Sequence, residues 1–81
     1  MNNTFQERIT ILINENGMTQ REFAEAIGVS KSSVQSYVSG TYAGGKALAK
    51  IARYFRVSVD WLLGLSNIRD GGVRKWVKEG K

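Results

Sequence analysis

The segment from residue 20 to residue 39 constrains the fold most, because its pattern fits two short helices that cross at a steep angle. Five apolar residues fall where they would point inward between these helices: Phe23, Ile27, Val29, Val34 and Tyr37. Ala24 is small where the second helix must pass close to the first. Gly28 stands where the chain leaves the first helix through a left-handed backbone conformation, which is costly for other residues. Each match is weak alone, but together they form a specific pattern.

The composition limits the chain to one small domain and removes most of the usual catalytic groups. With 81 residues, 42% of them hydrophobic, the chain can fill a modest core without a metal or a disulfide. It has no cysteine and no histidine, which excludes metal sites and nucleophile–base pairs built on those residues. Isolated acids such as Glu22 and Glu25 are better explained as helix-surface residues. We therefore expect no enzyme, no metal site and no cofactor.

Helical periodicity predicts a compact all-α bundle of five helices. The expected helices span residues 5–16, 20–27, 31–39, 46–55 and 59–63, joined by loops of about two to six residues. Their expected N-terminal residues are Thr4, Thr19, Ser30 and Ser58, of which the first two begin capping boxes with Glu7 and Glu22. The expected helix stops are Gly17, Gly28, Gly40 and Gly64. Residues 1–68 form the predicted domain, and residues 69–81 form a basic extension that is a linker, a tail or a short helix.

The positive charge of the chain is concentrated in its middle. The net charge is +5, and residues 26–59 contain no acid. The basic residues of this block are Lys31, Lys46, Lys50, Arg53 and Arg56. The block begins in the second of the two crossing helices and continues into the segments beside it, where contacts to phosphates would be wanted. Crossing helices next to a basic block are typical of a helix-turn-helix that binds DNA.

The chain resembles the lambda-repressor and Cro family of helix-turn-helix domains over about residues 5–66. The residues that carry the resemblance are Met18, Thr19, Gln20, Phe23, Ala24, Ile27, Gly28, Val29, Ser30, Val34, Tyr37, Gly40 and the run 57–64. The resemblance implies a five-helix domain that binds a two-fold operator as a homodimer, with helix 31–39 in the major groove. It also implies that Gln20 holds a phosphate. The expected function is that of a transcriptional repressor of the phage or prokaryotic kind, acting on double-stranded DNA.

One departure from the family concerns a partly buried ion pair. Members often pair an arginine in the first helix with a glutamate near the end of the third, and the matching residues here are Ile13 and Val38. Losing one partner alone would leave a buried charge at a cost of several kcal/mol, whereas replacing both by apolar residues can be neutral or stabilising. We therefore predict that Ile13 and Val38 pack together.

Helix geometry identifies the side of residues 31–39 that would face DNA. At about 100° per residue, the inward group of Val34, Tyr37 and Val38 has its opposite pole at two serines. The residues expected to read bases are Lys31, Ser32, Gln35 and Ser36. Because most of these side chains are short, water-bridged contacts and DNA shape should contribute to specificity. The alternative is that the serines serve only as caps and as solvated surface.

The residues expected to contact the DNA backbone surround this face. They are Gln20, Arg21, Ser33, Ser39, Thr41, Tyr42, Gly45 and Lys46. The family commonly has a basic residue and a proline after Gly40, and this chain has neither, so backbone amides should carry more of the contact. Glycines permit close approach to a phosphate, and the N-terminus of the fourth helix offers free N–H groups.

Apolar residues near the end of the domain exceed what the short fifth helix needs to anchor itself. The possible dimer interface consists of Trp61, Leu62, Leu65 and Ile68. The alternative is that Trp61 only closes the core. Trp76, an aromatic residue in the basic extension, is either docked on the domain, buried in a protein partner that binds the extension, or disordered.

The predicted location follows from what the sequence lacks. No apolar stretch is long enough to cross a bilayer, and the N-terminus has neither the basic nor the apolar region of a secretion signal. We expect a cytoplasmic protein of a prokaryotic or phage-infected cell, with no membrane partner.

Two alternative functions stay open at this level. The first is an antitoxin that represses its own operon and neutralises a toxin. The second is a protein-interaction module that keeps the fold without binding DNA. A neighbouring toxin would distinguish the first, and a salt titration of duplex binding would distinguish the second.

Overall fold

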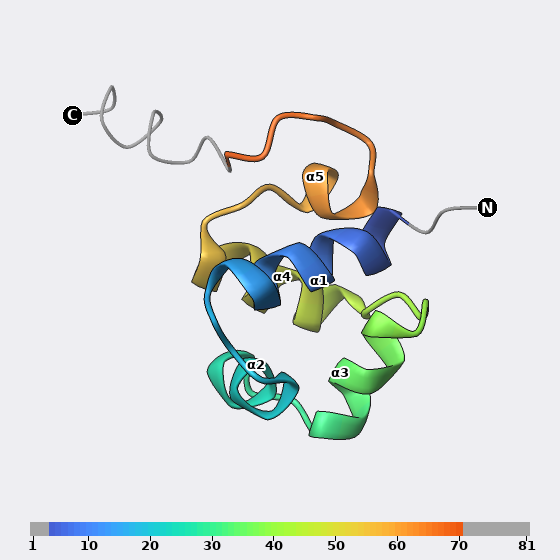
Figure 1. Cartoon of the computed structure of the whole chain (residues 1–81). Coiled ribbons are helices and arrows are strands. Elements are labelled where there is room, and N and C mark those ends of the chain that lie inside the picture. The colour runs from blue at the N-terminus through green and yellow to red at the C-terminus, as the bar shows by residue number, and fades with distance from the viewer. Residues whose placement is uncertain (1–3, 71–81) are drawn as a thin grey trace.

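The computed structural model describes residues 4–70, in which five helices enclose one hydrophobic core (Figure 1). The helices are α1 (Thr4–Glu15), α2 (Gln20–Ile27), α3 (Lys31–Val38), α4 (Gly45–Phe55) and α5 (Val59–Leu63). The predicted all-α class is confirmed, since β structure in the described residues is limited to an isolated bridge between Val57 and Asp70. Residues 71–81, most of the expected extension and including Trp76, lie outside the described residues.

The helices are arranged with α1 and α4 in the middle of the molecule, α2 and α3 at one end and α5 at the other (Figure 1). α1 contacts α3 and α5, and α4 contacts α2 and α5. The fully buried side chains between them are Phe5, Ile9, Leu12, Phe23, Val34, Ile51 and Leu62. Burying one such side chain contributes about 1.5–3 kcal/mol. None of the helices within residues 4–70 has the length and apolar character needed to cross a bilayer.

The helix-turn-helix is bounded by the caps that its sequence predicts. At the start of α2, the backbone N–H of Thr19 donates to the Glu22 carboxylate at 2.9 Å, and the N–H of Glu22 donates to the Thr19 hydroxyl at 3.0 Å. Gly28 ends α2 in the left-handed region, with φ 74°. The Ser30 hydroxyl accepts from the N–H of Ser33 at the start of α3. The capping box of α2 and the turn residues are therefore confirmed, and these local interactions define where α2 ends and α3 begins.

Several predicted helix ends are wrong by one residue. Thr4 is the first residue of α1 and not the cap before it, so the capping box predicted with Glu7 is not formed. α3 ends at Val38, with Ser39 as its cap, and α4 begins at Gly45. The end of α4 has a different cause, because Arg56 closes it in the left-handed conformation with φ 59° and donates its N–H to the carbonyl of Ala52. A sequence search for glycine stops does not find such an end.

The segment that follows α5, residues 65–70, is hydrogen-bonded back onto the start of that helix. The Ser58 hydroxyl caps α5 by accepting from Trp61 N–H at 2.9 Å and also donates to the carbonyl of Ile68 at 3.1 Å. The Ser58 N–H donates to the carbonyl of Arg69 at 2.9 Å. Together with the bridge between Val57 and Asp70, these hydrogen bonds hold residues 69 and 70 against the domain. Both residues belong to the extension predicted from the sequence.

Two arginines enclose the indole of Trp61. The guanidinium carbon of Arg8 lies 4.7 Å from the ring centroid and that of Arg69 lies 5.0 Å from it. Arg8 also donates to the carbonyls of Trp61 at 2.7 Å and Ser66 at 3.1 Å. Arg69 forms a two-pronged ion pair with Glu15 at the end of α1. α1, α5 and the 65–70 segment are thus joined through one aromatic ring.

Ile13 and Val38, where the family often has an ion pair, differ in their exposure to solvent. Ile13 is buried in the core, and Val38 is half-buried and packed against the same core. The amide of Gln6 donates to the carbonyl of Val38 at 2.7 Å, which attaches the end of α3 to the start of α1. Burial of Ile13 and partial burial of Val38 agree with the expectation for an apolar replacement. Direct contact between the two side chains stays a prediction.

Candidate nucleic-acid interface

The exposed side of α3 is set by the two residues that it buries. Val34 is fully buried and Tyr37 nearly so, and the Tyr37 ring packs edge-on against Phe5 of α1, with centroids 5.9 Å apart. The residues on the opposite side are exposed: Lys31, Ser32, Gln35 and Ser36. All four residues predicted to read bases therefore lie on the solvent side of α3.

A hollow with a volume of about 650 Å³ lies along this side of α3. It is lined by Gln20, Ser32, Gln35, Ser36, Val38, Ser39 and Thr41, and we call it the α3 hollow. Three segments contribute to it: the first residue of α2, the exposed face of α3 and the loop that follows α3. Within residues 4–70, the polar side chains that line the hollow make no hydrogen bonds, so they are available to a ligand.

Val38 is the one lining residue that the sequence did not predict. It belongs to the inward group of α3, yet its side chain is only half-buried and reaches the hollow. Val38 lies in the last turn of α3, between the core and the exposed face. That position could have predicted from the sequence that Val38 contributes to the site. Val38 gives the hollow an apolar wall suited to a methyl group or a sugar ring.

Six predicted contact residues lie outside the α3 hollow, and five of them are exposed: Arg21, Lys31, Tyr42, Gly45 and Lys46. Tyr42 is anchored, because its ring packs on Phe5 with centroids 5.3 Å apart, although 55% of the residue remains accessible. No side chain caps the first turn of α4. Its amide groups, next to Lys46, form the kind of helix N-terminus that favours anions.

Ser33 is the predicted backbone contact that the structure supports least. It is half-buried, and its hydroxyl lies 3.0 Å from the Ser30 hydroxyl at the cap of α3. Its N–H is already bonded to the same cap at 3.1 Å. These contacts assign Ser33 to the N-terminal cap of α3.

The basic residues of the candidate interface are not neutralised within the described part of the chain. The only ion pair of residues 4–70 joins Arg69 to Glu15, where the hydrogen bond from Arg69 lowers the pKa of the Glu15 carboxyl below its usual value. Lys31 and Lys46 therefore have no carboxylate partner among residues 4–70. A polyanion placed against α3 would meet their full positive charge.

The four residues of the expected dimer interface divide into two pairs. Trp61 and Leu62 are buried, with 6% and 0% of their surfaces accessible, so they belong to the core and present almost no surface to a partner. Leu65 and Ile68 are exposed, at 75% and 71%. The expected interface is corrected accordingly, and only this second pair is available for contact.

Comparisons with known proteins agree with this geometry. Residues 9–62 match the family described as helix-turn-helix. The chain is 33% identical over 60 residues to "Repressor protein CI" of Enterobacteria phage phi80, covering 74% of this chain and 25% of that protein. It is 32% identical over 76 residues to the "HTH-type transcriptional regulator for conjugative element SXT" of Vibrio cholerae, covering 84% and 35% respectively. The chain thus spans about a quarter to a third of the length of these relatives.

A solved structure extends the comparison to the fold. A transcriptional regulator from Listeria innocua superposes with a TM-score of 0.72 and 28% sequence identity, covering 98% of this chain and 77% of that one. The family match covers α2, α3 and the turn between them, together with most of α1 and all of α4. The chain belongs to the helix-turn-helix family, in the group of lambda-repressor and Cro-like domains.

Proposed function

We propose that this domain is a transcriptional regulator that binds double-stranded DNA sequence-specifically, with α3 in the major groove. The observation that carries the proposal is the α3 hollow, which Ser32, Gln35, Ser36, Gln20 and Thr41 line with side chains that make no hydrogen bond within residues 4–70. The relatives named above, described as a repressor and as transcriptional regulators, support a DNA-binding regulator. A helix that exposes polar side chains between two phosphate-binding segments has the form that groove recognition requires.

The roles proposed for the residues follow from their reach. Gln35 and Lys31 are long enough to contact base edges directly, and Gln35 suits adenine whereas Lys31 suits guanine. Ser32 and Ser36 are short, so they would act through close approach or bridging water. Gln20 of α2 and Thr41 of the loop after α3 would bind phosphates and fix how α3 enters the groove.

We propose further that the regulator acts as a repressor on a two-fold operator. Two copies would then read half-sites about 34 Å apart, one helical turn along the duplex. Leu65 and Ile68 supply exposed apolar surface for the contact between copies. Occupation of the operator would block access of the polymerase to the promoter.

Selection of bound duplexes from a random pool tests the reading face. We compare the native chain with a Ser32→Ala, Gln35→Ala double variant, which leaves the caps Ser30 and Thr19 intact. The native chain should enrich a defined sequence, and the variant should lose preference at the positions read by these residues, with a good bidentate contact contributing about 1–3 kcal/mol of discrimination. An unchanged preference would reject the assigned reading face. Absence of duplex binding at low salt would reject the function and favour an interaction module.

A further inference from the structure

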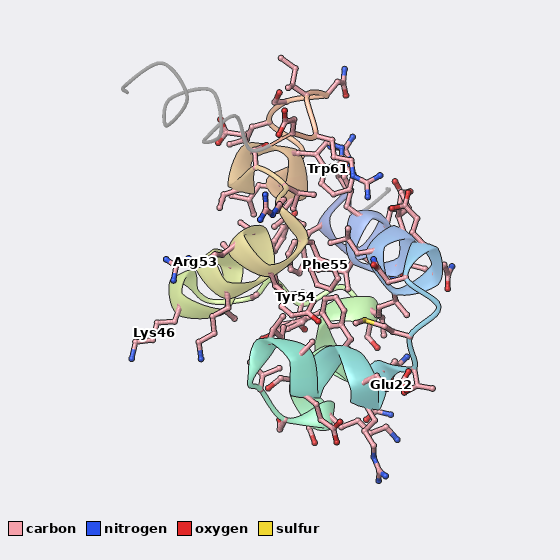
Figure 2. The ribbon with its side chains drawn as sticks, turned by 90° about the vertical axis from the view of Figure 1, so that its left-hand side faces the viewer. Glu22, Lys46, Arg53, Tyr54, Phe55 and Trp61 are labelled. Atoms are coloured by element: carbon pink, nitrogen blue, oxygen red, sulfur yellow. The ribbon has the colours of Figure 1, made fainter. Side chains whose placement is uncertain are left out.

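α4 carries a stripe of positive charge that the reading face does not include. Lys46, Lys50 and Arg53 are spaced by four and three residues, so they lie on one face of the helix, and all three are exposed. Figure 2 shows Lys46 and Arg53 pointing out from the same side of α4, with Glu22 of α2 on the other side of the molecule. We call these three residues the α4 stripe.

The α4 stripe has no compensating acid. No aspartate or glutamate occurs between residues 26 and 59. Within residues 4–70 no carboxylate lies within ion-pair distance of the three side chains, because the ion pair of that range involves Arg69 and Glu15. Like charges at this spacing oppose helix formation, and an external polyanion would relieve that repulsion.

The position of Lys50 connects the stripe to the reading helix. Its ammonium nitrogen lies 3.6 Å from the point that a Cβ on Gly28 would occupy. Gly28 ends α2, and the turn after it leads directly to Lys31, the first residue of α3. Lys50 therefore approaches the turn that precedes α3, which connects the stripe to the reading helix of the proposed binding mode.

We propose that Lys50 and Arg53, together with Lys46, bind phosphates of the DNA backbone beyond the segment read by α3. This inference rests on the proposed function and adds a contact surface to it. The stripe binds without reading sequence, because ammonium and guanidinium groups recognise phosphate charge. It therefore strengthens binding to every duplex by a similar factor and makes that binding more dependent on salt.

The test measures the affinity of the full chain for a duplex of mixed sequence, about two helical turns long, over a series of salt concentrations. The Lys50→Gln, Arg53→Gln double variant is compared with an Arg69→Gln control. Arg69 has the same charge, but it lies beside α5 at the other end of the molecule, where it is paired with Glu15. The slope of log K against log salt should become shallower by about 2 in the double variant and should stay near the native value in the control.

A second variant protects the test against effects on folding. Lys50 lies at the C-terminus of α2, where a cation also stabilises the helix dipole, so its replacement can lower the melting temperature. Arg53→Gln alone does not alter that contact, and it should reduce the slope by about 1. A native slope in both variants, while the native chain binds the duplex, would overturn this inference and leave the proposed function intact. No binding by the native chain would overturn both.

Discussion

The two ends of the molecule use their polar groups in opposite ways. Around α5 and the 65–70 segment, Arg8 and Arg69 donate hydrogen bonds to other parts of the chain and enclose the indole of Trp61. On α3, the side chains of Ser32 and Gln35 are exposed and make no hydrogen bond within residues 4–70. Polar groups bonded within the chain hold the fold, and those left unbonded can be changed without loss of the fold. The first end is therefore a scaffold, and the second is a surface whose sequence can vary with its ligand.

Trp61→Ala should produce the largest loss of stability and tests the scaffold end. The substitution removes a buried aromatic side chain and the ring on which Arg8 and Arg69 rest, with an expected cost of about 3–5 kcal/mol in the free energy of unfolding. Gln35→Ala, at the other end, should change that free energy by less than about 0.5 kcal/mol. Denaturant unfolding followed by circular dichroism measures both. Equal losses in the two variants would abolish the distinction between the two ends.

Gly64→Ala should have the next largest effect, and Gly17→Ala is its matched control. Both glycines have positive φ, 83° and 62°, so alanine at either position is strained by about 1–2 kcal/mol. Gly17 has open space around it, whereas a Cβ on Gly64 would lie 2.9 Å from the Cβ of Thr4. Moving Thr4 would disturb the start of α1 and should add roughly 1–3 kcal/mol for Gly64→Ala.

Thermal unfolding of the two glycine variants separates the effects of conformation and packing. The difference between their melting temperatures reports the close approach of α5 to α1, since the backbone strain is common to both. If the two variants melt at the same temperature, the contact between Gly64 and Thr4 is easily accommodated. The scaffold end would then depend on its hydrogen bonds and on Trp61 more than on close packing.

Local patterns explain why much of the helix-turn-helix was predictable. The caps of α2 and α3 depend on residues three apart, as in Thr19 with Glu22 and Ser30 with Ser33. The buried side of α3 follows from helix geometry alone, which is why Val34 and its opposite face were assigned correctly. Such signals are contained within one or two turns of helix, so they can be seen without the tertiary structure.

The features that the sequence did not predict depend on distant parts of the chain. Arg69 and Glu15 are 54 residues apart, and no local pattern relates them. The burial of Leu62 beside the exposure of Leu65 is decided by how α5 packs, since both are leucines in one short segment. The end of α4 at Phe55 was predicted, but the left-handed conformation of Arg56 that closes the helix was not, because an arginine rarely adopts it.

Arg69→Gln should have the smallest effect on stability, and the size of that effect depends on pH. The hydrogen bond from Arg69 lowers the pKa of Glu15 in the folded protein below its value in the unfolded chain. The ion pair therefore stabilises the fold fully above the unfolded pKa, and this contribution is lost as the pH falls through the folded pKa. Native protein should melt above Arg69→Gln at neutral pH, by a small margin because the pair is exposed, and the two melting temperatures should converge in acid.

A Glu15→Gln variant shows whether the difference in melting temperature comes from the ion pair or from the contact of Arg69 with the aromatic ring. Glutamine at residue 15 removes the titrating group, so it should abolish the pH dependence while leaving Arg69 against Trp61. The bond from Ser58 N–H to the carbonyl of Arg69 involves only backbone at residue 69 and persists in both variants. If the difference in melting temperature between the native protein and Arg69→Gln stays constant down to acid pH, the stabilisation comes from the contact of the guanidinium with the indole. The 65–70 segment would then be held by the ring and by backbone bonds, with Glu15 contributing nothing.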